Sequence, residues 1–201
     1  MKPFVPLLCA AATATLMHGA LAADLSNGDQ RFLRKAGESG LLEIQASQLA
    51  VERGQHPEVK RYAEMMIKDH TAVDKELKAL ASAKGFQLPT ELDGGKRRLI
   101  EKLRKAEGQD FDEEYADEVA VDAHEDAVEL FEDAADDTDD AEVKAFAAKH
   151  LPALQKHLDM GRQLEDAVDE ADDRRGERPA DRKAAPAAGS GGPVVVPGTG
   201  G

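Results

Sequence analysis

Two segments of the chain repeat the same pattern of apolar and polar positions. One begins EVKRYAEMMIKDH at residue 58, and the other begins EVKAFAAKHLPALQKH at residue 142. At about 100° per residue, each pattern places its apolar side chains in one stripe and most of its charged side chains opposite, which predicts amphipathic helices. The first stripe contains Tyr62, Ala63, Met66, Val73, Leu77 and Leu80, with His70 at its centre; the second contains Phe146, Ala147, Leu154 and Leu164, with His150 and His157 among them.

Capping and turn signals predict where the helices begin and end. Ser26 and Asp29 have the spacing of a capping box, which predicts a first helix from there to about residue 53. Pro57 suits the first turn of a second helix, and Gly85 is a suitable C-terminal stop for it. The loop FQLPTELDGG then precedes a short helix near residues 96–106, a long helix over about 110–135, and a last helix that follows the aspartate run at 136–140 and ends near Asp172.

No segment alternates with period two for long enough to predict a strand. If the two similar segments correspond, their preceding helices correspond too, and the chain forms two helical hairpins. The sequence therefore predicts an all-α fold, an antiparallel up-down-up-down four-helix bundle with a short extra helix between its second and third long helices. We expect this bundle to occupy residues 24–172.

Both ends of the chain differ from the bundle in composition. Residues 1–23 have the features of a signal peptide, with Lys2, a stretch rich in Leu and Ala, and small residues at Ala20 and Ala22. A signal peptide predicts a periplasmic or secreted protein. Its cleavage would remove Cys9, the only cysteine of the sequence. Residues 173–201 are rich in Arg, Ala, Pro and Gly, which predicts a disordered tail.

The charge narrows the range of partners. The formal net charge is −14 at pH 7, which opposes binding to nucleic acids and to anionic lipid surfaces. Trp is absent and aromatic residues make up 4% of the chain, so stacking surfaces for bases or sugars are scarce. We therefore expect the partner to be an unknown protein or a component of the cell envelope. The sequence does not determine the oligomeric state.

Polar residues on the apolar stripes are the candidates for chemistry, because a histidine in a core requires hydrogen bonds or a ligand. Glu43 lies about 60° from the centre of its stripe and His124 about 80° off the centre of its own. The number of residues between each site residue and the nearest loop estimates its position along the bundle axis. This count places Glu43 and His70 at similar levels, and it places His124 closer to the level of His150 than to that of His157. Glu43, His70, His124 and one of His150 or His157 have the ligand types of a mononuclear site for zinc, copper or iron. The alternative is that the histidines are structural residues, bonded to Glu43, Tyr62, Tyr115 or backbone carbonyls.

Four segments resemble a known family, the secreted bacterial domain of unknown function numbered 4142. They are FLRKAGESGLLEIQASQLA, VKRYAEMMIKDH, FDEEYADEVAVDAHEDAVELF and VKAFAAKHLPALQKHL, and the resemblance covers about residues 30–167. It implies a ferritin-like four-helix bundle that is exported and has no established activity. Its pattern falls on Glu43, His70, His124 and His157, whereas at His150 the family more usually has a small or hydroxyl residue.

The sequence departs from a ferritin-like di-iron site, which needs Glu-x-x-His on two helices. Ile67 and Leu154 stand where those glutamates would be. The sequence therefore favours a non-catalytic exported bundle, acting in the envelope or in stress as a binding module. The alternative is a metal-binding protein that uses the histidine and glutamate site, and an oxidoreductase is the least favoured reading. No catalytic residue is predicted.

Overall fold

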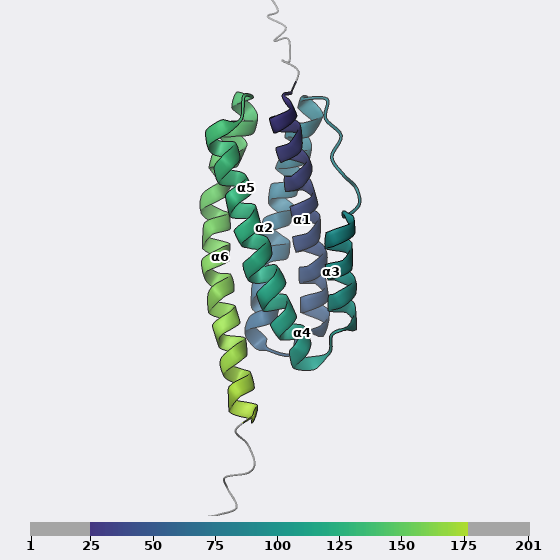
Figure 1. Cartoon of the computed structure of the whole chain (residues 1–201), viewed down its shortest axis with the longest axis vertical. Helices are drawn as coiled ribbons and strands as arrows, with labels where there is room; N and C mark the ends of the chain where they lie inside the picture. The colour runs from purple at the N-terminus through teal and green to yellow at the C-terminus, as the bar shows by residue number, and fades with distance from the viewer. Residues whose placement is uncertain (1–24, 177–201) are drawn as a thin grey trace, which may run out of the picture.

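A computed structural model describes residues 25–176, and helices are the only regular secondary structure in this part of the chain (Figure 1). The expected all-α class is confirmed. The predicted signal peptide and most of the predicted tail lie outside the described residues. The elements are α1 (Asn27–Arg53), α2 (Pro57–Ala83), α3 (Gly94–Lys105), α4 (Gly108–Tyr115), the π-helix η1 (Ala116–Asp122), α5 (Ala123–Asp137) and α6 (Ala141–Gly176).

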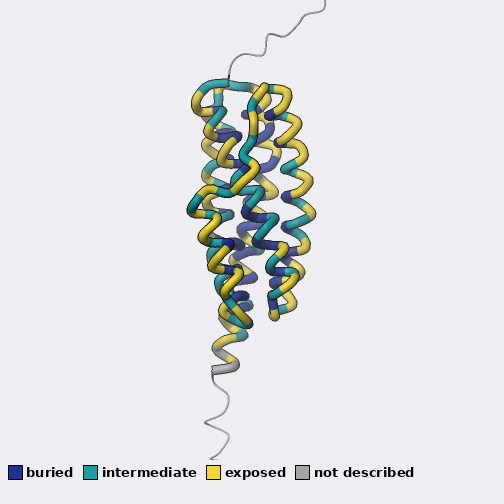
Figure 2. Tube along the Cα trace, turned by 90° about the vertical axis from the view of Figure 1, so that its right-hand side faces the viewer, coloured by how far each residue is buried: buried dark blue, intermediate teal, exposed yellow. Residues whose placement is uncertain are grey.

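The long helices lie side by side along one axis. α1 packs against α2, and α5 packs against α6, while α4, η1 and α5 follow one another without a loop. The short helix α3 lies against the outside of α1, and the end of α6 extends beyond the other helices (Figure 1). Buried residues line the inside of this arrangement and exposed residues its outside (Figure 2).

The predicted capping residues are found where the helices begin and end. The Ser26 side chain accepts from the Asp29 amide, and the Asp29 carboxylate accepts from the Ser26 amide, which completes the capping box of α1. Pro57 is the first residue of α2. Gly85, with φ +67°, follows α2 in the left-handed region that glycine tolerates best. Local sequence therefore determines these boundaries.

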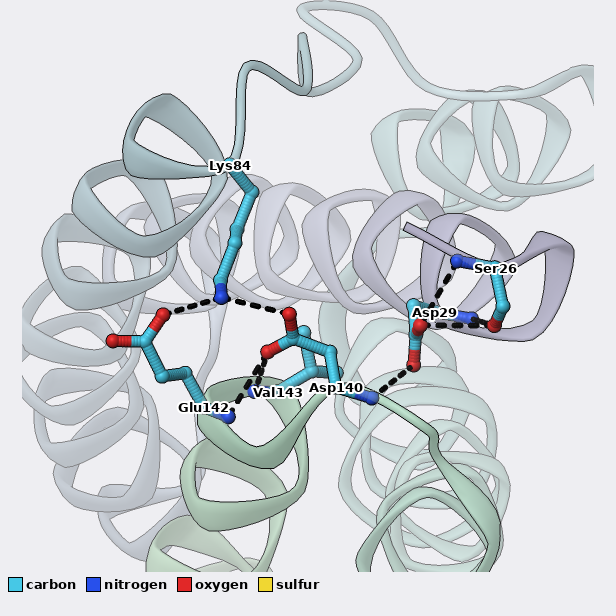
Figure 3. Close-up of polar contacts among 6 residues, drawn as sticks. All are labelled: Ser26, Asp29, Lys84, Asp140, Glu142 and Val143. Atoms are coloured by element: carbon cyan, nitrogen blue, oxygen red, sulfur yellow. Dashed lines mark hydrogen bonds and ion pairs between the residues drawn. The ribbon is translucent and has the colours of Figure 1, made fainter. Parts of the chain in front are cut away.

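Asp140 joins three elements at the end of the molecule where α1 begins (Figure 3). Its carboxylate accepts from the amides of Glu142 and Val143 and so caps α6. The same carboxylate pairs with Lys84 at the end of α2, at 2.7 Å, and Lys84 also pairs with Glu142. The Asp140 amide lies 3.4 Å from the Asp29 carboxylate in α1. The aspartate run therefore serves as a loop and a helix cap.

The structure differs from the sequence prediction in two elements. The third long helix is not regular, because residues 116–122 form a π-helix within it. The last helix ends at Gly176 rather than at Asp172, so its final turn lies within the segment predicted as tail. The π-helix and α6 approach each other closely: a Cβ atom built on Gly161 would lie 2.0 Å from the carbonyl oxygen of Ala120.

The core consists of two apolar clusters stacked along the bundle. One contains Phe32, Leu77, Phe131 and Phe146, among others, and the second contains Ala46, Met66, Tyr115 and Leu164, among others. On their helices, His70, His124 and His157 fall between the positions that contribute to one cluster and those that contribute to the other. Glu43 on α1 directly follows Leu42, a member of the second cluster. Four of the buried polar side chains, those of Glu43, His70, His124 and His157, thus form a polar layer where the two apolar clusters meet.

Candidate metal centre

Three imidazoles from three helices meet in this layer. His70 lies on α2, His124 at the start of α5 and His157 on α6. One possible ligand atom from each lies within 4.8 Å of the other two. The ring centroids are 5.5 Å apart for His70–His124 and for His70–His157, and 5.7 Å apart for His124–His157. We call these three residues the histidine cluster.

Glu43 of α1 adds a carboxylate to the same layer. Its Oε1 lies 3.7 Å from Nδ1 of His124, and both residues are 0% exposed. Neither carboxylate oxygen of Glu43 has a hydrogen-bond partner among the described residues. A buried carboxylate without a partner is costly, so its retention at this place requires an explanation.

Two of the histidines are oriented by hydrogen bonds from outside the cluster. Nδ1 of His124 lies 3.0 Å from the carbonyl oxygen of Val119, and Nε2 of His157 lies 3.2 Å from Oδ2 of Asp69. Val119 belongs to the π-helix, which thus supplies the carbonyl that orients His124. Such contacts to the second ring nitrogen are typical of metal-binding histidines.

One nitrogen of each ring is left without a partner. Nε2 of His70, Nε2 of His124 and Nδ1 of His157 are buried and form no hydrogen bond within the described part of the chain. A neutral imidazole has one nitrogen that can donate a lone pair. The cluster can therefore present three lone pairs to a single electrophile, such as a metal ion or a proton.

Tyr62 lies beside the histidine cluster, and Tyr115, the second tyrosine of the chain, lies beside Tyr62. The ring of Tyr62 is 6.2 Å from that of His124, and its hydroxyl donates to the carbonyl oxygen of His157 at 3.1 Å. The Tyr115 ring is 6.3 Å from that of Tyr62, and its hydroxyl bonds with Ser47 at 2.8 Å. Because the chain has no Trp, its intrinsic fluorescence comes from these two side chains.

Burial shifts the protonation equilibria in this layer. Desolvation lowers the pKa of His70 well below its usual value, and the neighbouring His124 and His157 lower it further. Desolvation also lowers the pKa of His124, to about 4, and that of His157. It raises the pKa of Glu43 well above the usual value. The three imidazoles are therefore neutral at pH 7, which is the form that binds metals.

The structure brings together four of the five residues that the sequence singled out. Glu43, His70, His124 and His157 share one layer, whereas His150 does not. Nε2 of His150 lies 3.1 Å from a Glu76 carboxylate oxygen, and its ring lies 4.5 Å from that of Phe146. His150 is therefore held by a surface carboxylate, outside the histidine cluster.

Two sequence inferences about geometry were wrong. Counting residues from the loop matched His124 with His150, but helical side chains lean toward the N-terminus of their helix. α5 runs toward the loop and α6 runs away from it, so the lean carries α5 side chains away from the loop and α6 side chains toward it. His124 therefore meets a residue of α6 that is farther from the loop in sequence than His124 is, and this residue is His157 rather than His150. The stripe arithmetic placed His124 at an edge, yet it is completely buried. The π-helix just before it breaks the regular 100° step that the arithmetic assumes.

Sequence reasoning missed the groups that orient the histidines. Asp69 neighbours His70 in the chain but contacts His157 of another helix. The Val119 group that contacts His124 is a backbone carbonyl, so no residue type could have identified it. The position of Asp69 about 100° from His70 on its helix predicts only that Asp69 faces solvent or an adjacent helix, and it does not identify His157 as the partner.

The comparisons with known proteins identify a family and a fold. The family described as "Domain of unknown function (DUF4142)" matches residues 14–164. A search of curated proteins returned no match. No helix among residues 25–176 is long and apolar enough to cross a membrane.

Two solved structures are similar to this chain. One is a DUF305 fragment from Deinococcus radiodurans, with a TM-score of 0.62 and 12% identity, covering 74% of this chain and 99% of that one. The second is CopM in the Cu(II)-bound form, with a TM-score of 0.55 and 18% identity, covering 69% of this chain and 96% of that one. At these identities the similarity concerns the fold.

Proposed function

This chain belongs to the DUF4142 family, whose description states no function, and we propose that it binds one divalent transition-metal ion in the core of the bundle. His70, His124 and His157 are the proposed nitrogen ligands, and Glu43 is the proposed fourth ligand. The ion would lie in the polar layer between the two apolar clusters, shielded from solvent.

The observation that carries the proposal is the set of buried atoms without partners. Within residues 25–176, three imidazole nitrogens and both Glu43 oxygens have no hydrogen-bond partner, and all belong to one layer. Each buried polar group without a partner costs about 1–3 kcal/mol. A set of histidines that served only packing would leave several such costs uncompensated. One metal ion bound by all four side chains would offset the costs of all these buried polar atoms at once.

The geometry suits a single ion. A tetrahedral ion about 2.1 Å from each ligand holds the donor atoms about 3.4 Å apart. The histidine atoms already lie within 4.8 Å of one another, so small side-chain rotations bring them to this spacing. Glu43 lies outside that group, with Oε1 3.7 Å from Nδ1 of His124, so its side chain must move farther to complete the site. The contacts of Val119 and Asp69 hold two of the rings in an orientation that leaves the ligand nitrogen free.

The ligand types favour copper or zinc. Imidazole and carboxylate ligands suit Zn(II), Cu(II) and iron, and affinity rises toward Cu(II) in the divalent series. The similar CopM structure contains Cu(II) by its own description. We therefore expect Cu(II) to bind most tightly and Zn(II) to compete for the same ligands.

The proposed role is binding rather than catalysis. The described residues bury three carboxylates, and only Glu43 is beside the histidines, since Asp29 caps α1 and Asp112 accepts from the Gln55 and His56 amides. A di-iron site uses four carboxylates. We further infer an up-down-up-down bundle of the ferritin-like type, exported to the periplasm or beyond and acting there as a metal-binding module.

Elemental analysis of protein purified without an affinity tag tests the proposal. We expect up to one copper or zinc ion per chain, and a Cu(II) titration should quench the fluorescence of Tyr62 and Tyr115 with a one-to-one end point. His150→Gln is the matched control, because this histidine is buried but lies outside the cluster. Full-strength quenching in His150→Gln is expected. The absence of any saturable quenching in the unaltered protein would refute the proposal.

A further inference from the structure

A small cavity lies beside the histidine cluster, between α1, α2 and the helices that face them. Its volume is about 20 Å³, which is close to the space that one water molecule occupies. His70 is the one member of the histidine cluster among its lining residues. The other walls include Ser39, Gly40, Asp74, Leu77 and Phe131.

The polarity of the cavity changes from its rim to its interior. Ser39 and Asp74 are partly exposed, and Asp74 accepts from Lys78 at the surface. Leu77 and Phe131 are buried, at 2% and 5% exposed. Partly exposed polar side chains, buried apolar side chains and one imidazole thus line the same cavity.

Gly40 keeps this passage open. A Cβ atom built on Gly40 would have no atom within 4 Å, so the space in front of it is unfilled. Glycine in the interior of a helix costs about 0.5–1 kcal/mol relative to alanine. Its presence in the middle of α1, where no positive φ requires it, is consistent with a need for that space.

We propose that this cavity is the path by which a divalent metal ion reaches the cluster, with His70 as the first ligand that it meets. The inference rests on the proposed metal-binding function. A volume near that of one water molecule is too small for a hydrated ion, so passage requires loss of water and a transient widening of the walls. The widening of the cavity walls, rather than the collision of the ion with the protein, then limits metal uptake. The observed uptake rate therefore reaches a plateau at high metal concentration.

The two other histidines offer less direct access. His124 is 0% exposed. His157 is as exposed as His70, at 5%, but its Nε2 is occupied by the contact with Asp69. A path on the Asp69 side is the competing alternative, and substitutions at Gly40 would not affect it.

The test measures rates of metal uptake and release in the full chain. Rapid mixing with Cu(II) follows tyrosine quenching, and a chelator chase follows its recovery. In Gly40→Leu, whose side chain fills the cavity, we expect both rates to fall by about tenfold while the Kd stays within about twofold. Gly40→Ala is the control for helix propensity, because it adds only one methyl group. Val73→Ala, which widens a wall, should raise both rates.

A measurement without metal separates this inference from the proposed function. Exchange of the imidazole C2 hydrogen for deuterium depends on access of solvent. In metal-free protein we expect His70 to exchange faster than His124, and Gly40→Leu to slow His70. If the unaltered protein takes up Cu(II) but neither its rates nor the His70 exchange respond to Gly40→Leu and Val73→Ala, the path lies elsewhere and the inference is wrong. If no metal binds at all, the proposed function itself fails.

Discussion

The Glu43 carboxylate lies 3.7 Å from Nδ1 of His124, and neither side chain has measurable contact with solvent. That nitrogen already contacts the Val119 carbonyl, so Glu43 is left without a hydrogen-bond partner in the described residues. Burial raises the pKa of Glu43, which means that its charged form is disfavoured in the metal-free protein. Glu43 therefore lowers the stability of the metal-free protein, and a cation bound beside the carboxylate would offset this cost.

Replacing Glu43 by Gln should separate stability from metal binding. The substitution keeps the shape and removes the buried ionisable group, so the metal-free variant is expected to melt at the same temperature as the unaltered protein at pH 7, or above it. Its Cu(II) affinity should fall by about tenfold or more, since one ligand is lost. Thermal melts and tyrosine-quenching titrations measure the two effects. A clearly lower melting temperature without metal would show that Glu43 stabilises the fold by itself.

His70→Leu should fold and lose metal affinity. His70 is 5% exposed, and its helix buries apolar residues on both sides of it, so leucine suits the position. Circular dichroism should show an unchanged helical content, and Cu(II) should no longer quench the tyrosines at one equivalent. His150→Leu is the matched control and should bind copper normally. Unchanged metal uptake by His70→Leu would remove this residue from the site.

The metal-free protein should lose stability as the pH falls below about 6. The folded pKa values of His70, His124 and His157 are lowered, so the unfolded chain binds more protons than the folded one below the usual value of 6.5. Their contribution to stability is present above that value and disappears as the pH falls toward about 4, the folded pKa of His124. Glu43, with a raised pKa, acts in the opposite direction, but one carboxyl opposes three imidazoles.

Added metal should change this profile only at higher pH. Protons compete with the ion for the same nitrogens, so zinc or copper should raise the melting temperature above about pH 6 and have little effect below it. Melting curves across the pH range, with and without metal, give the answer. If metal produces no shift at any pH, the histidines are structural residues only.

Gly161→Ala should destabilise the protein, although alanine favours helices. Its Cβ would lie 2.0 Å from the Ala120 carbonyl oxygen and 2.7 Å from the carbonyl carbon, and backbone cannot move aside as a flexible side chain can. Displacing α6 from the π-helix is expected to cost about 1–3 kcal/mol. Gly40→Ala is the matched control, because it meets no atom within 4 Å and should be neutral or stabilising by up to about 1 kcal/mol. Chemical denaturation measures both, and equal effects would contradict the close approach at Gly161.

The sequence by itself determined the helices and their inward faces. Stripe periodicity, the Ser26–Asp29 capping box, Pro57 and Gly85 are local signals, and each acts within a few residues of its own position. For the same reason the sequence could indicate that Glu43 and His70 face the core, because that depends only on their own helices.

Tertiary structure decided which of these residues meet. The choice of His157 over His150 depends on how far two helices slide along each other and on the lean of their side chains. The full burial of His124 depends on a π-helix, and Asp69 acts on a ring of a different helix. These are relations between segments far apart in the chain, and they arise only when the two apolar clusters pack and bring the polar layer together.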